Sequence, residues 1–241
     1  MRYKIELSYF GRDFHGWQRQ LNAISVQQTI EDAINVVFRD EIMLIGCGRT
    51  DTGVHARKYI AHFDSDKEYN NDAAMKLNNY LPFSIAIHSI ESVSSDFHAR
   101  FNAVKRTYQY QICLTKNPFF VDSAWLIYQH LDVNLMNIAA EQLFKYTDFT
   151  SFSKLHTDVK TNNCDVQYAK FELNENVLIF TIIADRFLRN MVRAIVGTLI
   201  DVGKGKINID EFSTIIEAKD RSEAGQSAPA HGLFLVDVTY P

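Results

Sequence analysis

The sequence predicts an α+β fold in which two halves share a central, mostly antiparallel sheet with flanking helices. Apolar and polar residues alternate from Arg2 to Tyr9, which is typical of a half-buried strand. The elements expected along residues 1–104 recur in a similar order along residues 105–241. No Gly/Ser-rich or Pro-rich linker separates these N-terminal and C-terminal α+β halves, so we expect one compact, rigid body.

In the first half the patterns predict a strand, a helix, two strands around a turn, a helix and a strand. Ser25 is a typical helix N-cap, and apolar residues follow it at helical spacing. The second helix should end before Leu81-Pro82, because proline disfavours helix at the preceding residue. The expected ranges are 2–9, 26–37, 42–45, 59–63, 72–79 and 85–93.

In the second half the expected elements are a strand at 108–114, a helix at 133–144, strands at 166–173 and 177–184, two helices, and a strand at 233–240. The run 177–184 is apolar almost throughout, so we expect it to lie centrally with both faces covered. A helix beginning near Arg186 would place Arg186, Arg189 and Arg193 within about 60° of one another. Such a row is either a solvated basic face or a surface that binds phosphates.

Composition limits the classes of function. A chain of 241 residues with 46% hydrophobic residues can bury a substantial core. The three cysteines lack metal-like spacing and the eight histidines form no helical pair, so we expect no disulfide framework and no metal. No phosphate-loop or dinucleotide motif appears, so no cofactor is expected.

The location and the charge of the chain bear on its partners. No apolar run approaches the roughly 20 residues of a membrane span, and the start does not resemble a signal peptide, so we expect a cytoplasmic protein without membrane contact. The net charge of −4 argues against a nucleic-acid partner unless the basic side chains converge on one face.

The most informative segment runs from Gly46 to Ala56 and reads GCGRTDTGVHA. It places Asp51 beside Arg49 in a turn between two expected strands, with Gly48 and Gly53 allowing a tight backbone and close approach of a ligand. A neighbouring guanidinium favours the ionised carboxylate, which suits a nucleophile or an ion-pair partner. The pattern alone also fits an ordinary turn whose Asp and Thr side chains bond their own backbone.

This segment resembles the signature of the tRNA pseudouridine synthase A family, and further segments that match in the same order cover nearly the whole chain. They are Tyr9-Phe10-Gly11, 14–18, 25–27, 78–82, 97–101, 106–110, 149–152, 187–193 and 228–233. Agreement at so many separate places makes coincidence improbable.

The resemblance implies duplicated ferredoxin-like (RRM-like) halves, 1–104 and 105–241, that form one catalytic unit with a cleft between them. It also implies an isomerase that needs no cofactor. It implies conversion of uridine to pseudouridine at positions 38, 39 and 40 of the tRNA anticodon stem-loop, by a homodimer. It assigns catalysis to Asp51 as the nucleophile, with Arg49, Tyr108 and Arg193, and it places Tyr108 and Leu233 against the target base. By spacing alone, Tyr108 is more simply a core tyrosine.

Other candidate contacts to RNA are basic or aromatic residues outside that set. His15 and Trp17 near Arg12 form either a stacking surface with phosphate contacts or a loop packed on the body of the protein. Arg100, beside His98, has the same two interpretations, and Arg186 and Arg189 are candidate phosphate contacts.

Two other functions remain open at this stage. An RNA-binding protein that has lost its activity would need the basic faces but not Asp51. An unrelated hydrolase with an aspartate nucleophile would turn over small substrates without RNA.

Overall fold

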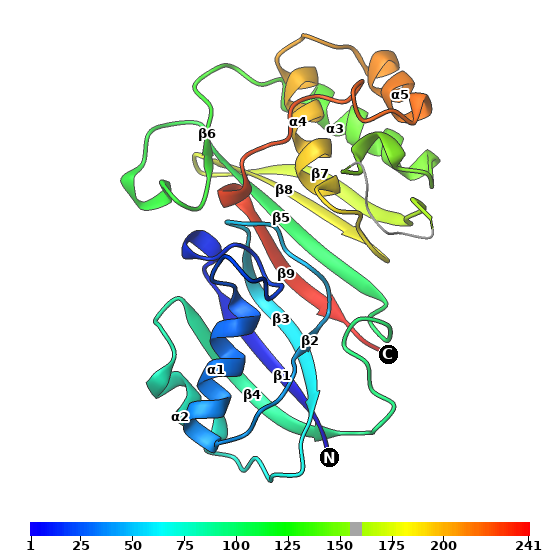
Figure 1. The fold of residues 1–241 in the computed structure, drawn as a ribbon. Coiled ribbons are helices and arrows are strands. Elements are labelled where there is room, and N and C mark those ends of the chain that lie inside the picture. The colour runs from blue at the N-terminus through cyan, green and yellow to red at the C-terminus, as the bar shows by residue number, and fades with distance from the viewer. Residues whose placement is uncertain (155–160) are drawn as a thin grey trace. The chain divides into compact units, whose positions relative to one another are not determined.

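The computed structural model describes residues 1–154 and 161–241 and divides the chain into two units (Figure 1). One unit comprises residues 1–104 and 234–241, and the other comprises residues 105–233. The last eight residues, which we expected in the second half, group with the first unit, because the last strand pairs with a strand of that unit.

The first unit is a mostly antiparallel sheet with two helices on one face (Figure 1). Its strands run in the order β4-β1-β3, and both β2 and β9 pair with β3, β2 antiparallel and β9 parallel. The elements are β1 (Arg2–Tyr9), α1 (Val26–Phe38), β2 (Ile45–Gly46), β3 (His55–Asp64), α2 (Ala73–Tyr80), β4 (Ile85–Val93) and β9 (Leu233–Thr239).

The core of the first unit follows from the alternation along β1. Tyr3, Ile5 and Leu7 are buried, and the residues between them are only partly covered. The register pairs Leu7 with Tyr59 and Ile5 with Ala61, so buried residues of two neighbouring strands share one face. The predicted order of elements in this half is confirmed.

The second unit is also a sheet with helices, and its main strands run antiparallel in the order β5-β8-β7. The short strand β6 pairs in parallel with β5. The elements are β5 (Lys105–Cys113), β6 (Trp125–Leu126), α3 (Val133–Glu141), β7 (Val166–Asn174), β8 (Val177–Ala184), α4 (Met191–Gly203) and α5 (Ile209–Ala218). Short 3₁₀ helices occur at Gly11–Asp13, Pro118–Phe120, Gln142–Lys145, Thr150–Phe152 and Ala230–Gly232.

Both units are therefore α+β with mostly antiparallel strands and flanking helices, as predicted. One expectation about packing was wrong. Leu178, Phe180 and Ile182 of β8 are buried, but the alternate side chains of this strand are only partly covered. The helices of the unit cover one face of its sheet (Figure 1), so an almost continuous apolar run does not require two covered faces here.

A second difference concerns the start of α4. The helix begins at Met191, five residues after the expected Arg186. The carboxylate of Asp185 accepts the backbone N–H groups of Arg186 and Asp165, both at 2.7 Å, which fixes a non-helical connection. Asn190 then precedes the helix in the left-handed region at φ 67°. The arginine row predicted on one helical face is therefore wrong, because Arg186 and Arg189 precede the helix.

Candidate active site

The segment 46–54 forms a closed turn between β2 and β3 in the first unit. The N–H of Val54 donates to the carbonyl of Asp51 at 3.1 Å, and Gly53 adopts a φ of 79°. Asp51 is half-buried and Arg49 is exposed. The turn thus presents the aspartate at the surface of the unit and does not bury it in the core.

Three aromatic residues from the core of the first unit support this turn. The hydroxyl groups of Tyr9 and Thr50 are hydrogen-bonded at 2.9 Å, and the hydroxyl of Tyr59 donates to the carbonyl of Gly48. The rings of Trp17 and Tyr59 stack at 4.0 Å, and both residues are buried. Buried polar groups that are fully paired give a fixed backbone, so the residues next to Asp51 have one defined position.

The loop that precedes α1 forms a second support. The N–H of Trp17 donates to the carbonyl of Thr50 at 3.3 Å, and the N–H of Gly53 donates to the carbonyl of Phe14 at 3.3 Å. Gly16 has a φ of 84°, and a Cβ there would lie 2.3 Å from the carbonyl oxygen of Thr50. Only glycine allows this close approach.

The glycines of the motif differ in their roles. A Cβ on Gly46 would lie 2.1 Å from the hydroxyl oxygen of Tyr59 and 2.6 Å from the indole nitrogen of Trp17. A Cβ on Gly48 would meet nothing within 4 Å. The expected need for glycine in a tight backbone therefore holds at Gly53, because of its positive φ, but not at Gly48. It also holds at Gly46, which we had not singled out.

The loop around His15 is only partly the stacking surface that we considered. Trp17 is 2% exposed and packs against Tyr59, so it is part of the core of the unit. Arg12 and His15 are exposed, and the exposed Arg19 is held by Glu31 at 2.9 Å. Arg12 and His15 therefore remain accessible to a ligand, and the indole does not.

The segment after β4 carries Arg100. Both Arg100 and Phe101 are exposed, and the guanidinium lies 5.6 Å from the centroid of the Phe101 ring. The Nδ1 of His98 accepts the N–H groups of Arg100 and Phe101 at 3.2 and 3.3 Å. Burial and the charge of Arg2 lower the pKa of His98, which favours the neutral ring that can accept these bonds.

In the second unit, Tyr108 lies near the start of β5 and is half-buried. Its ring meets that of Phe187 edge to face at 5.2 Å. Tyr110, two residues on, is fully buried, its hydroxyl donates to the carbonyl of Pro229 at 2.8 Å, and burial raises the pKa of its phenol. Of the two tyrosines, Tyr108 is the one whose ring is accessible.

Arg193 lies in the first turn of α4, a helix buried on nearly all sides, and is itself half-buried. Its Nε donates to the carbonyl of Ala228 at 2.7 Å, and the N–H of Ala228 donates to the carbonyl of Arg193 at 2.9 Å. The segment 228–233 is thereby tied to the helix, and it ends at Leu233, which is buried at the start of β9.

Arg186 is partly covered and Arg189 is exposed, each in the connection before α4. The described residues contain no group of three or more His, Cys, Asp or Glu side chains that suits a metal ion. The three cysteines are buried thiols. Within the described ranges, no helix is both long enough and apolar enough to cross a membrane.

Sequence reasoning found the turn but missed most of its supports. The alternation along β1 places Tyr9 on the buried face, yet it does not indicate that its hydroxyl reaches Thr50. Two buried polar residues of α1, Gln27 and Glu31, were also missed, because the helical pattern was interpreted from its apolar positions alone.

Comparison with known proteins identifies the family. The model of a family described as tRNA pseudouridine synthase matches residues 139–241. The chain is 52% identical over 242 residues to a tRNA pseudouridine synthase A of Parabacteroides distasonis, covering 100% of this chain and 96% of the relative. It is 50% identical to that of Bacteroides thetaiotaomicron (100% and 91% covered) and 37% identical to that of Francisella tularensis subsp. novicida (99% and 94% covered). This chain therefore belongs to the tRNA pseudouridine synthase A family and is an isomerase that acts on tRNA.

Proposed function

We propose that this enzyme converts uridine to pseudouridine at positions 38, 39 and 40 of the tRNA anticodon stem-loop, with Asp51 as the residue that acts on the target nucleotide. The observation that carries the proposal is the construction of the Asp51 turn. A half-buried carboxylate follows residues that are held by Tyr9 through the Thr50 hydroxyl and by Trp17 and Tyr59 through backbone carbonyls. Such preorganisation suits a reaction in which a carboxylate must meet one atom of a bound substrate.

The reaction is an internal rearrangement of the nucleoside. The bond from N1 of uracil to C1′ breaks, a bond from C5 to C1′ forms, C5 loses a proton and N1 gains one. Atoms and electrons balance without a second substrate. Asp51 either attacks C1′, removes a sugar proton to give a glycal, or adds to C6 of the base, and each route uses an ionised carboxylate.

The target nucleotide must leave the RNA stack before the carboxylate can reach it, at a cost of a few kcal/mol. The exposed Arg49, two residues from Asp51, is suited to occupy the vacated place. We assign Tyr108 to stacking on the uracil, with the phenol or a water as acceptor of the C5 proton, and Leu233 to an apolar wall that excludes water.

Arg193 is proposed as the ion-pair partner of Asp51 during the reaction. Its Nε is already held by the carbonyl of Ala228, which restricts the directions that the guanidinium can take. Arg12, His15, Arg100, Arg186 and Arg189 are proposed to contact the RNA backbone, since each is at least partly exposed and carries N–H donors that suit phosphate oxygens.

We also propose that both units are ferredoxin-like halves and that a catalytic cleft lies between them. The order β4-β1-β3-β2 in the first unit, with antiparallel neighbours throughout, supports this arrangement. Superposition of the two units in an experimental structure should place α3 on α1 and α4 on α2, and a mismatch of these helices would contradict the duplication.

A homodimer in the cytoplasm completes the proposal. A second subunit would add basic surface to a chain whose net charge is −4, and so help to hold a polyanion. Light scattering at micromolar concentration should give twice the mass of the chain, and a monomeric mass would contradict the dimer. Cell fractionation should recover the enzyme with the soluble tRNA.

The positions modified are tested with unmodified tRNA transcripts that carry 5-tritiated uridine. Three transcripts each keep one uridine among positions 38, 39 and 40, and a fourth has none there. Release of tritium from each of the first three and not from the fourth supports the proposed positions, and a transcript without release removes its position from the proposal. Equal release from the fourth would place the modified uridines elsewhere in the tRNA.

A further inference from the structure

Two polar residues are buried on the inner side of α1, where the other buried residues Val26, Ile30 and Ile34 are apolar. Gln27 is 5% exposed and Glu31 is 6% exposed. Burying a carboxylate costs several kcal/mol unless its oxygens are paired. Packing α1 on the sheet needs only apolar side chains, so this pair requires another explanation.

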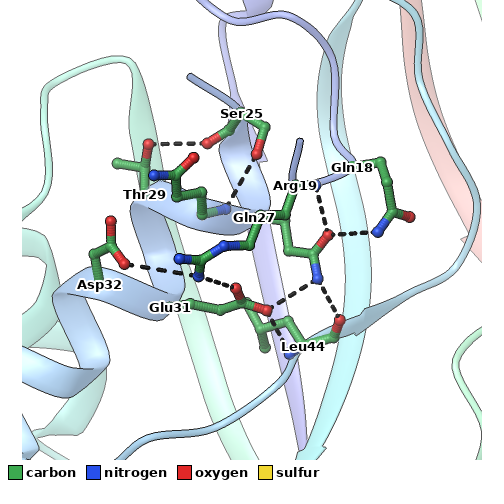
Figure 2. Close-up of polar contacts among 9 residues, drawn as sticks. Gln18, Arg19, Ser25, Gln27, Thr29, Glu31, Asp32 and Leu44 are labelled. Atoms are coloured by element: carbon green, nitrogen blue, oxygen red, sulfur yellow. Dashed lines mark hydrogen bonds and ion pairs between the residues drawn. The ribbon is translucent and has the colours of Figure 1, made fainter. Parts of the chain in front are cut away.

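The contacts of Glu31 join the helix to two other segments (Figure 2). Its Oε1 accepts the N–H of Leu44 and the Nε2 of Gln27, both at 2.9 Å. Its other carboxylate oxygen accepts from the guanidinium of Arg19 at 2.9 Å. Both oxygens of the buried carboxylate are therefore paired.

The amide of Gln27 uses all of its hydrogen-bonding groups in the same way (Figure 2). Its Oε1 accepts the backbone N–H of Arg19 at 2.9 Å and the side-chain amide of Gln18 at 3.0 Å. Its Nε2 donates to Glu31 at 2.9 Å and to the carbonyl of Leu44 at 3.0 Å. We call Gln27 and Glu31 together the α1 clamp.

Of the two segments held by the α1 clamp, one continues into the Asp51 turn and the other contacts it. Leu44 directly precedes β2, the strand that enters the turn. Arg19 follows Trp17, whose N–H donates to the carbonyl of Thr50 and whose own carbonyl accepts the N–H of Gln27 at 3.0 Å. One helical turn of α1 therefore holds both the segment that enters the Asp51 turn and the loop whose Trp17 bonds Thr50.

From this geometry we propose that Gln27 and Glu31 are positioning residues, which set the place of Asp51 by holding residues 18–19 and 44. This rests on the proposed catalytic role of Asp51. A displacement of about 1 Å at a catalytic group costs as much as 100-fold in rate. Loss of the clamp should lower kcat and leave tRNA binding almost unchanged, since neither residue is exposed to a ligand.

The test compares Gln27→Met with Asn78→Leu, two near-isosteric changes in the same unit. Gln27→Met leaves the carbonyl of Leu44 and the N–H of Arg19 without their side-chain partner. Asn78→Leu leaves the N–H and the carbonyl of Ile87, on the edge strand β4, without their side-chain partner. The two variants should lose similar thermal stability. Asn78→Leu therefore separates an effect on the position of Asp51 from an effect of lost stability.

Tritium release from 5-tritiated tRNA is measured at a temperature at which circular dichroism shows every variant folded. Gln27→Met should lose at least tenfold in kcat with KM within about threefold, while Asn78→Leu keeps kcat within about twofold of the wild type. Glu31→Leu should behave like Gln27→Met. Glu31→Gln should recover most of kcat, because its amide oxygen can still accept the N–H of Leu44.

Equal kcat in Gln27→Met and the wild type would overturn the proposal, and so would an equal loss in Asn78→Leu, which would reveal an effect of stability alone. Asp51→Asn is assayed in parallel. An active Asp51→Asn enzyme refutes the proposed role of Asp51, whereas an inactive one beside a fully active Gln27→Met enzyme refutes the clamp alone.

Discussion

Adding one methyl group at Gly16 should disable the enzyme without touching any side chain that contacts the substrate. The Cβ of Gly16→Ala would lie 2.3 Å from the carbonyl oxygen of Thr50, about 1 Å short of ordinary contact between carbon and oxygen. Thr50 is the residue before Asp51, and its carbonyl already accepts the N–H of Trp17. The turn must therefore move for the methyl group to fit.

The expected loss of stability has two parts. A side chain at a φ of 84° costs about 1–2 kcal/mol, and overpacking a fixed site costs about 1–3 kcal/mol. The free energy of unfolding, measured in urea, should therefore fall by about 2–5 kcal/mol. A shift of about 1 Å at Asp51 should lower kcat for tritium release by about 100-fold, with tRNA binding retained.

Gly205 provides the matched control, because its φ is 69° and a Cβ there would meet nothing within 4 Å. Gly205→Ala should show only the cost of the backbone conformation, about 1–2 kcal/mol, and normal kcat. A Gly16→Ala enzyme that keeps kcat within about threefold of the wild type would refute the reasoning that the loop at Gly16 fixes the catalytic turn.

Three further predictions concern single side chains. Arg193→Lys keeps a positive charge but loses the planar group that donates to Ala228, so kcat should fall more than tenfold at nearly constant tRNA affinity; unchanged kcat would remove Arg193 from the proposed site. Tyr110→Phe removes the bond to Pro229 and should cost about 1 kcal/mol in urea unfolding, whereas no loss would show that this buried bond contributes nothing net. Burial lowers the pKa of His62 to about 4 in the folded protein. Between pH 6.5 and 4 the unfolded chain therefore binds more protons than the folded one, and the free energy of unfolding should decrease as the pH is lowered. His62→Gln should weaken that dependence, and a variant with the same pH profile as the wild type would contradict the assignment.

The sequence predicted the elements of the first unit because its periodicities are simple. The alternation along β1 and the apolar positions of α1 each indicate one buried face, and both elements form as expected. The strand before the Asp51 turn was predicted too long for a physical reason. The backbone N–H and carbonyl of Leu44 are bonded by Glu31 and Gln27, so regular pairing with β3 begins only at Ile45.

Interactions over long sequence separations explain the other differences. The spacing of Arg186, Arg189 and Arg193 fits a helix, but the carboxylate of Asp185 accepts the backbone N–H of Asp165, 20 residues earlier, and this bond fixes a non-helical connection. The residues around Trp17 have the composition of a surface loop, yet the Trp17 ring packs on Tyr59, more than 40 residues away in sequence. No local pattern records either contact. Resemblance supplied the candidate catalytic residues, and the structure added the residues that support them.

The most direct test of this account is tritium release from unmodified tRNA carrying 5-tritiated uridine, measured with the wild type and with Asp51→Asn alongside tRNA binding by both. Asn is nearly isosteric with Asp but cannot supply a carboxylate. The account predicts release by the wild type, no release by Asp51→Asn, and similar binding by both. Release by Asp51→Asn at the rate of the wild type would contradict the central role of Asp51.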